Sequence, residues 1–62
     1  MPIVRIEIAQ GRTADQLREL GIKVSRAVAE SLSVSESTIR VLVHEMDPAL
    51  WFSGGQPLAN RK

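Results

Sequence analysis

The sequence predicts a small α/β (α+β) fold: a single β-α-β unit with two parallel strands, followed by a C-terminal hairpin and completed by other subunits. Three observations predict it. Residues 3–8 alternate with the period of a strand, residues 14–32 have apolar positions at helical spacing, and residues 38–46 are again apolar and β-branched. Because strand, helix and strand follow one another closely, we expect parallel strands joined by a right-handed crossover.

The first strand is predicted from the segment IVRIEI. Val4, Ile6 and Ile8 fall on one face of an extended chain, whereas Arg5 and Glu7 fall on the other. Proline lacks an amide N–H and is tolerated at the first residue of a strand. Pro2 therefore fits the start of this strand and has the parity of its buried face.

The helix is predicted to begin after Thr13 and to run to about Leu32. Gly11 indicates a turn, and Thr13 followed three residues later by Gln16 forms the pattern of a capping box. The apolar residues expected on the buried face of the helix are Leu17, Leu20, Val24, Ala27, Val28 and Leu32.

The second strand, residues 38–46, is apolar on both predicted faces. One face carries Ile39, Val41 and Val43, and the other carries Arg40, Leu42 and His44. We therefore expect this strand to be more buried than the first. In the tail that follows, Asp47-Pro48 and Gly54-Gly55 are turn signals, and the glycine pair predicts the centre of a hairpin.

Length and composition point to a subunit of an oligomer. The 62 residues make one domain, residues 1–62, with 44% apolar residues and no cysteine. A chain of this size has a marginal core and usually needs disulfides, a metal or partner subunits. With no cysteine and one histidine, oligomerisation is the remaining route, and it would also cover the exposed edges of a two-stranded sheet.

The charge pattern excludes several classes of protein. The net charge is +1 and the only aromatic residues are Trp51 and Phe52, which is not typical of a nucleic-acid-binding protein. No apolar run approaches the length of a membrane span, and no signal peptide is visible. A cytoplasmic location is the expectation.

The amino terminus is the main candidate for chemistry. His44 has no evident orienting partner and is interpreted as a packed or interface histidine, and Glu7 and Glu45 as solvated or paired carboxylates. Removal of Met1 would leave a free secondary amine on Pro2. Such an amine acts as a general base when its pKa is lowered toward the working pH by burial and by nearby positive charge.

Arg12 and Arg40 are the candidates for that positive charge, and guanidinium groups also bind carboxylates with two hydrogen bonds. Each arginine also has an alternative interpretation. Arg12 could be a solvated turn residue, and Arg40 could form an ion pair with a strand carboxylate. Pro2 and Arg12 lie at opposite ends of the first strand, so a site between subunits would reconcile their spacing with oligomerisation. Trp51 and Phe52 fit either a pocket or a subunit interface.

Together these features resemble the 4-oxalocrotonate tautomerase family. The segments that carry the resemblance are MPIVRIEIAQGRT, the amphipathic helix, STIRVLVHEM and WFSGG, and they cover nearly the whole chain. The resemblance implies tautomerase-like β-α-β subunits in a homo-oligomer, a hexamer built as a trimer of dimers. It also implies cofactor-free keto–enol isomerisation of a small dicarboxylate or 2-oxo acid such as 2-hydroxymuconate, without a metal.

The resemblance assigns roles to individual residues. Pro2 is the implied general base, Arg12 holds the distal carboxylate, and Arg40 from another subunit engages the 2-oxo acid end. Trp51 stands at an aromatic position that walls the apolar pocket and keeps the pKa of the proline amine low. Substrate-binding residues on this basis are Arg12, Arg40, Trp51, Phe52 and Ala9.

Departures from the family pattern affect the expected substrate. Phe52 replaces a small residue, Ala9 a larger apolar one, and Pro48 and Pro57 stiffen the tail. One alternative is a 3-haloacrylate dehalogenase, which needs a carboxylate near the tail to activate water, and the segment LWFSGG offers none. A second alternative is a non-catalytic subunit of a mixed oligomer.

Overall fold

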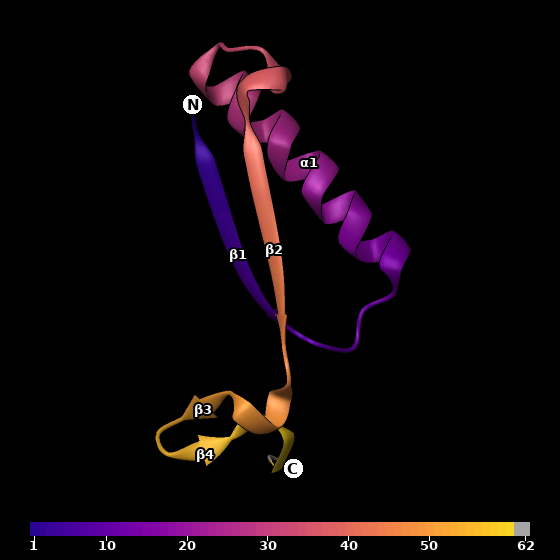
Figure 1. Cartoon of the computed structure of the whole chain (residues 1–62), viewed down its shortest axis with the longest axis vertical. Coiled ribbons are helices and arrows are strands. Elements are labelled where there is room, and N and C mark those ends of the chain that lie inside the picture. The colour runs from indigo at the N-terminus through magenta and orange to yellow at the C-terminus, as the bar shows by residue number, and fades with distance from the viewer. Residues whose placement is uncertain (61–62) are drawn as a thin grey trace.

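The computed structural model describes residues 1–60. It consists of strand β1 (Ile3–Ala9), helix α1 (Ala14–Leu32), strand β2 (Arg40–Met46) and a short hairpin of β3 (Phe52–Ser53) and β4 (Gln56–Pro57). Single turns of 3₁₀ helix occupy Glu36–Thr38, Pro48–Leu50 and Leu58–Asn60. Figure 1 shows α1 lying along β1 and β2, with the hairpin beyond the end of β2.

The two long strands are parallel, as predicted. Their register runs from Ile3 opposite Arg40 to Ala9 opposite Met46. Backbone hydrogen bonds extend the pairing at both ends, from Arg40 N–H to the Pro2 carbonyl (3.0 Å) and from Gln10 N–H to the Met46 carbonyl (2.9 Å). The hairpin is antiparallel with Gly54-Gly55 at its turn, which confirms the prediction for the tail.

The helix begins where the sequence indicates. The Thr13 hydroxyl accepts the Gln16 N–H (3.1 Å), and the Gln16 side-chain oxygen accepts the Thr13 N–H (2.9 Å), so the capping box is complete. Ser33 ends the helix in the left-handed region with φ of 57°. These local bonds satisfy backbone donors that the first helical turn leaves free.

The buried face of α1 differs in part from the prediction. Ala27 and Leu32 are exposed, whereas Ala29 is buried. Gly21, Ser25 and Ala29 recur at every fourth position and are the small residues turned toward the rest of the fold. A row at this spacing forms a ridge along a helix, and small side chains let that ridge approach its neighbour closely. The exposed fraction of Leu32 is 55%, because it lies in the last turn.

The strands are covered on one face only. Val4, Ile6 and Ile8 are half-buried with Val41 and Val43, as the alternation predicts. The prediction that β2 is more buried than β1 is wrong for the single chain: Leu42 is 51% exposed and its neighbours on that face, Arg40 and His44, are also exposed. The reason is that α1 covers one face, and within residues 1–60 no second layer covers the other.

The subunit has little core of its own. Ala29 and Ile39 are the buried apolar residues of the described chain. The accessible surface is 4784 Å², against about 4,000 Å² expected for a compact chain of this mass. The radius of gyration is 14.5 Å, against about 11 Å for a compact domain of this length. The chain is therefore elongated, and apolar surface that a compact fold would bury stays exposed.

Candidate active site

Pro2 and Arg40 lie together at one end of the two-stranded sheet. The Pro2 carbonyl accepts the Arg40 backbone N–H, and the strand register starts one residue later. The Arg40 guanidinium is exposed and its Nη1 donates to the carbonyls of Ser37 (3.0 Å) and Ile39 (3.3 Å). Within residues 1–60 it forms no ion pair with a carboxylate, so that alternative for Arg40 is not observed.

Arg12 lies at the opposite end of β1. Its Nη1 donates to the carbonyl of Ala9 (3.2 Å), the last residue of the strand, and the side chain is exposed. Gly11 has φ of 131°, a conformation that favours glycine and that turns the chain toward α1. The seven residues of β1 span about 20 Å, so one chain cannot bring Pro2 and Arg12 into a single small-molecule site.

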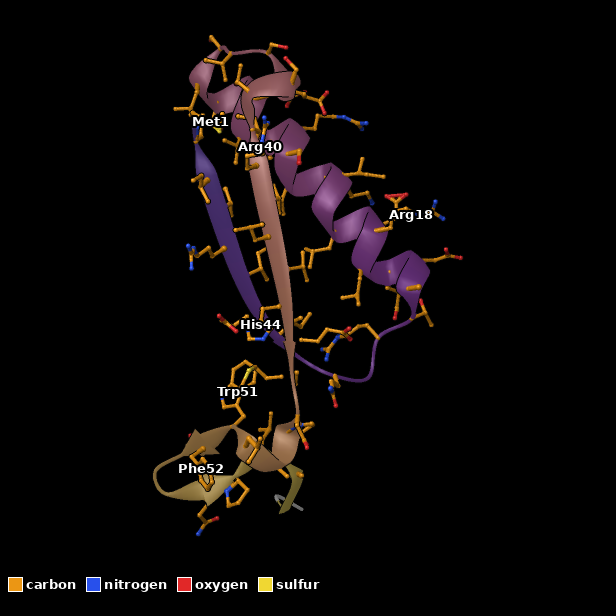
Figure 2. The ribbon with its side chains drawn as sticks, in the orientation of Figure 1. Met1, Arg18, Arg40, His44, Trp51 and Phe52 are labelled. Atoms are coloured by element: carbon orange, nitrogen blue, oxygen red, sulfur yellow. The ribbon has the colours of Figure 1, made fainter. Side chains whose placement is uncertain are left out.

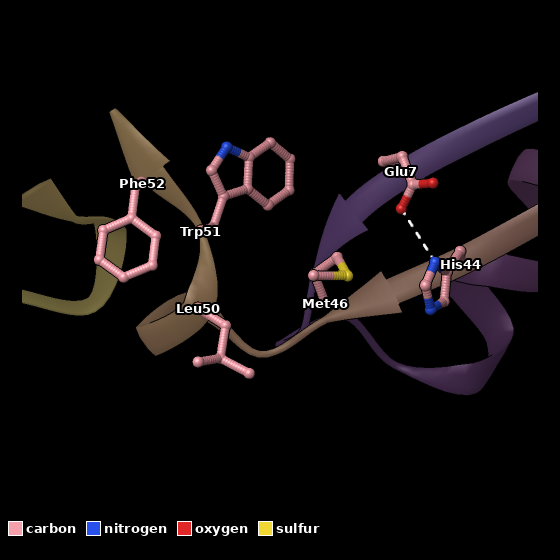
Figure 3. A pocket seen from close by; sticks show the side chains of 6 residues that line it. All are labelled: Glu7, His44, Met46, Leu50, Trp51 and Phe52. Atoms are coloured by element: carbon pink, nitrogen blue, oxygen red, sulfur yellow. Dashed lines mark ion pairs between the residues drawn. The ribbon is translucent and has the colours of Figure 1, made fainter. Parts of the chain in front are cut away.

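A groove lies where the end of the sheet meets the tail. It is open to solvent and has a volume of about 490 Å³, and Figure 3 shows the side chains around it. Six residues line it: Glu7, His44, Met46, Leu50, Trp51 and Phe52. All are apolar except the acid Glu7 and the imidazole of His44. Trp51 is half-buried, and its carbonyl accepts the Leu58 N–H (2.7 Å), which ties the hairpin back onto the aromatic residue.

The predicted site residues thus separate into two groups. Trp51 and Phe52 line the groove, and Ala9 and Arg12 lie at the same end of the sheet, since Ala9 pairs with the groove residue Met46. Pro2 and Arg40 form the other group, joined by a backbone hydrogen bond. Figure 2 shows Arg40 at the end of the strand pair away from Trp51 and Phe52.

The Glu7–His44 pair was missed by the sequence analysis. Glu7 Oε1 lies 3.0 Å from His44 Nδ1, and the two side chains are 59% and 67% exposed. His44 is therefore neither packed nor without an orienting partner in this chain. The strand register predicts this contact: in a parallel pair with Ile3 opposite Arg40, Glu7 must stand opposite His44.

Across residues 1–60, no group of three or more His, Cys, Asp or Glu side chains is arranged to hold a metal ion. In the same part of the chain, no helix is both long and apolar enough to cross a membrane.

Comparisons with known proteins identify the family of the chain. The family model described as tautomerase enzyme matches residues 2–61. The 2-hydroxymuconate tautomerase of Pseudomonas sp. (strain CF600) is 40% identical over 57 residues, covering 92% of this chain and 90% of that protein. The 2-hydroxymuconate tautomerase of Bacillus subtilis is 37% identical over 60 residues, covering 97% of each.

A solved structure shows the same fold. The heterohexamer 4-oxalocrotonate tautomerase from Chloroflexus aurantiacus superposes with a TM-score of 0.93 at 31% identity, and the match covers 100% of both chains. The fold and these relatives thus define a tautomerase-type subunit. The chain belongs to the tautomerase family.

Proposed function

We propose that this chain is the subunit of a cofactor-free keto–enol tautomerase acting on a 2-hydroxydienoate such as 2-hydroxymuconate, with Pro2 as its general base after removal of Met1. The observation that carries the proposal is the similarity to 2-hydroxymuconate tautomerase over 92% of the chain. Position supports it too: Pro2 directly precedes β1, and Met1 before it is 78% exposed and accessible to an aminopeptidase.

The proposed reaction moves one proton and no other group. The Pro2 amine takes the proton from the enol hydroxyl, the oxygen–hydrogen bond breaks and a carbonyl forms. The π electrons shift along the conjugated carbon chain of the substrate, and the same amine delivers the proton to a carbon atom of the substrate. Negative charge that develops on the dienolate is stabilised by guanidinium donors, which act most strongly where water is excluded. Arg12 and Arg40 are the proposed donors, and Arg12 holds the distal carboxylate.

The proposed site is shared between subunits. Pro2 and Arg40 lie at one end of the strand pair, and Arg12 and Trp51 lie at the other, so copies of the chain must meet for all four to surround one substrate. The exposed sheet face and the excess accessible surface support assembly. A hexamer, built as a trimer of dimers, is the proposed state, in line with the hexameric neighbour.

Replacing Pro2 tests the mechanism. In Pro2→Ala, kcat for ketonisation of 2-hydroxymuconate should fall by about 10²-fold, the usual contribution of a positioned general base. Native mass spectrometry of the same variant serves as the control, since the assembly should match that of the wild type. Full activity in Pro2→Ala would exclude proline as the base.

One observation supports a second candidate function. Dehalogenation of a 3-haloacrylate needs a carboxylate to activate water, and Glu7 places one in the groove beside Trp51. We rank this function second because the Glu7 carboxylate already lies 3.0 Å from His44 Nδ1 in an ion-pair position. Chloride release from 3-chloroacrylate, measured in the wild type and in Glu7→Gln, distinguishes the two.

A further inference from the structure

The groove has one polar wall, and the proposed mechanism does not use it. Four of its six lining residues are apolar, and the other two are Glu7 and His44. Both side chains come from the sheet, whereas Leu50, Trp51 and Phe52 come from the tail (Figure 3). A mostly apolar cavity with a few convergent polar groups is the usual form of a small-molecule site, and about 490 Å³ lies within the common range of volume.

The pairing leaves one nitrogen of His44 available. Nδ1 lies 3.0 Å from Glu7 Oε1, so the carboxylate forms an ion pair with the protonated imidazole and favours this orientation of the ring. In residues 1–60 no protein group bonds to Nε2 of His44, while the ring remains exposed. In the protonated imidazole, Nε2–H is then a charge-assisted donor at the edge of an apolar groove.

We propose that His44, oriented by Glu7, binds a carboxylate of an unsaturated carboxylic acid whose planar chain lies against Trp51. The inference rests on the proposed function for its choice of ligand class, and it adds a carboxylate-binding residue to that site. His44 is the residue that touches the ligand. Glu7 is a positioning residue, which acts through the imidazole.

Trp51 makes the groove directly observable. It is the only tryptophan, and the chain has no tyrosine, so intrinsic fluorescence reports this groove alone. Titration with muconate, a diene dicarboxylate without the enol hydroxyl, measures binding with no proton transfer. Its neutral dimethyl ester tests for the carboxylate contact, and saturated adipate tests for the planar contact with the indole.

His44→Gln should weaken muconate binding about tenfold and leave binding of the dimethyl ester unchanged, the loss expected for one hydrogen bond to a charged group. Arg26→Gln is the control, because it removes a positive charge from an exposed position on α1, outside the groove and away from the uncovered face of the sheet. Equal muconate affinity in wild type and His44→Gln would overturn the proposal. The proposal would also be overturned if Trp51 fluorescence changes when the protein is diluted but does not change when the ligand is added. The groove would then be a contact between subunits.

The role of Glu7 is tested by a double-mutant cycle. If Glu7 acts through the imidazole, Glu7→Gln changes muconate affinity in the wild type but not in the His44→Gln background. Equal effects in both backgrounds would contradict the positioning role. These binding measurements are independent of Pro2. Failure of the proline mechanism would appear in the kcat of Pro2→Ala, whereas failure of this inference would appear in the muconate affinity of His44→Gln.

Discussion

The backbone N–H of Arg40 donates a 3.0 Å hydrogen bond to the carbonyl of Pro2, which places the candidate base and one candidate anion-binding residue at the same end of the sheet. Arg12 is bonded to Ala9 at the other end. This separation means that the proposed site, which uses Pro2, Arg12 and Arg40 on one substrate, requires more than one copy of the chain.

Arg12→Ala should raise KM about tenfold or more with a smaller change in kcat. The guanidinium is proposed to hold the distal carboxylate equally well in the ground state and in the transition state. Its loss therefore weakens substrate binding without a matching rise in the barrier of the bound substrate. Steady-state kinetics with 2-hydroxymuconate measures this. Arg18→Ala is the control, because Arg18 forms only an exposed ion pair with Asp15 on α1 and its removal should leave both constants unchanged.

Retention of Met1 should abolish activity. An amide nitrogen in the Met1–Pro2 bond has no basic lone pair, so Pro2 acts as a base only when it is the first residue. Intact mass spectrometry identifies the two forms, and each is assayed after separation. Activity of the Met1-containing form comparable to that of the processed form would contradict the mechanism and favour a different base.

Leu42→Asp should disrupt assembly. The Leu42 side chain is 51% exposed on the uncovered face of the sheet, and a charge there would be desolvated in any contact that covers that face. Sedimentation should show a smaller species with reduced activity. Ala27→Asp, an exposed position on α1, should sediment like the wild type. An unchanged assembly in Leu42→Asp would mean that this face does not form the interface.

Thr13→Ala should destabilise the protein by about 1 kcal/mol per subunit, since it removes the side chain that accepts the Gln16 N–H. Urea unfolding measures the free energy, at one fixed protein concentration because assembly contributes to the apparent stability. Ser31→Ala, an exposed substitution inside the helix, should be neutral or slightly stabilising. Equal stability of the two variants would show that the capping box contributes nothing.

Local signals in the sequence determined most of the secondary structure. The alternation in IVRIEI, the Thr13–Gln16 spacing and the Gly54-Gly55 pair each specify a short-range geometry, and β1, the start of α1 and the hairpin follow them. The family resemblance was likewise carried by short segments in order along the chain, and the comparisons confirm it.

Tertiary structure decided what those elements do together. The Glu7–His44 contact depends on the strand register, which pairs residues far apart in the chain, and residue spacing along one strand does not reveal it. Exposure of Leu42 depends on which face α1 covers, so apolar character alone predicted burial wrongly. The sequence by itself determined the elements and the family. Only the tertiary structure decided which side chains line the groove together and which residues lie beside Pro2 at its end of the sheet. Both depend on how two strands pair with each other, which the order of residues along one strand does not specify.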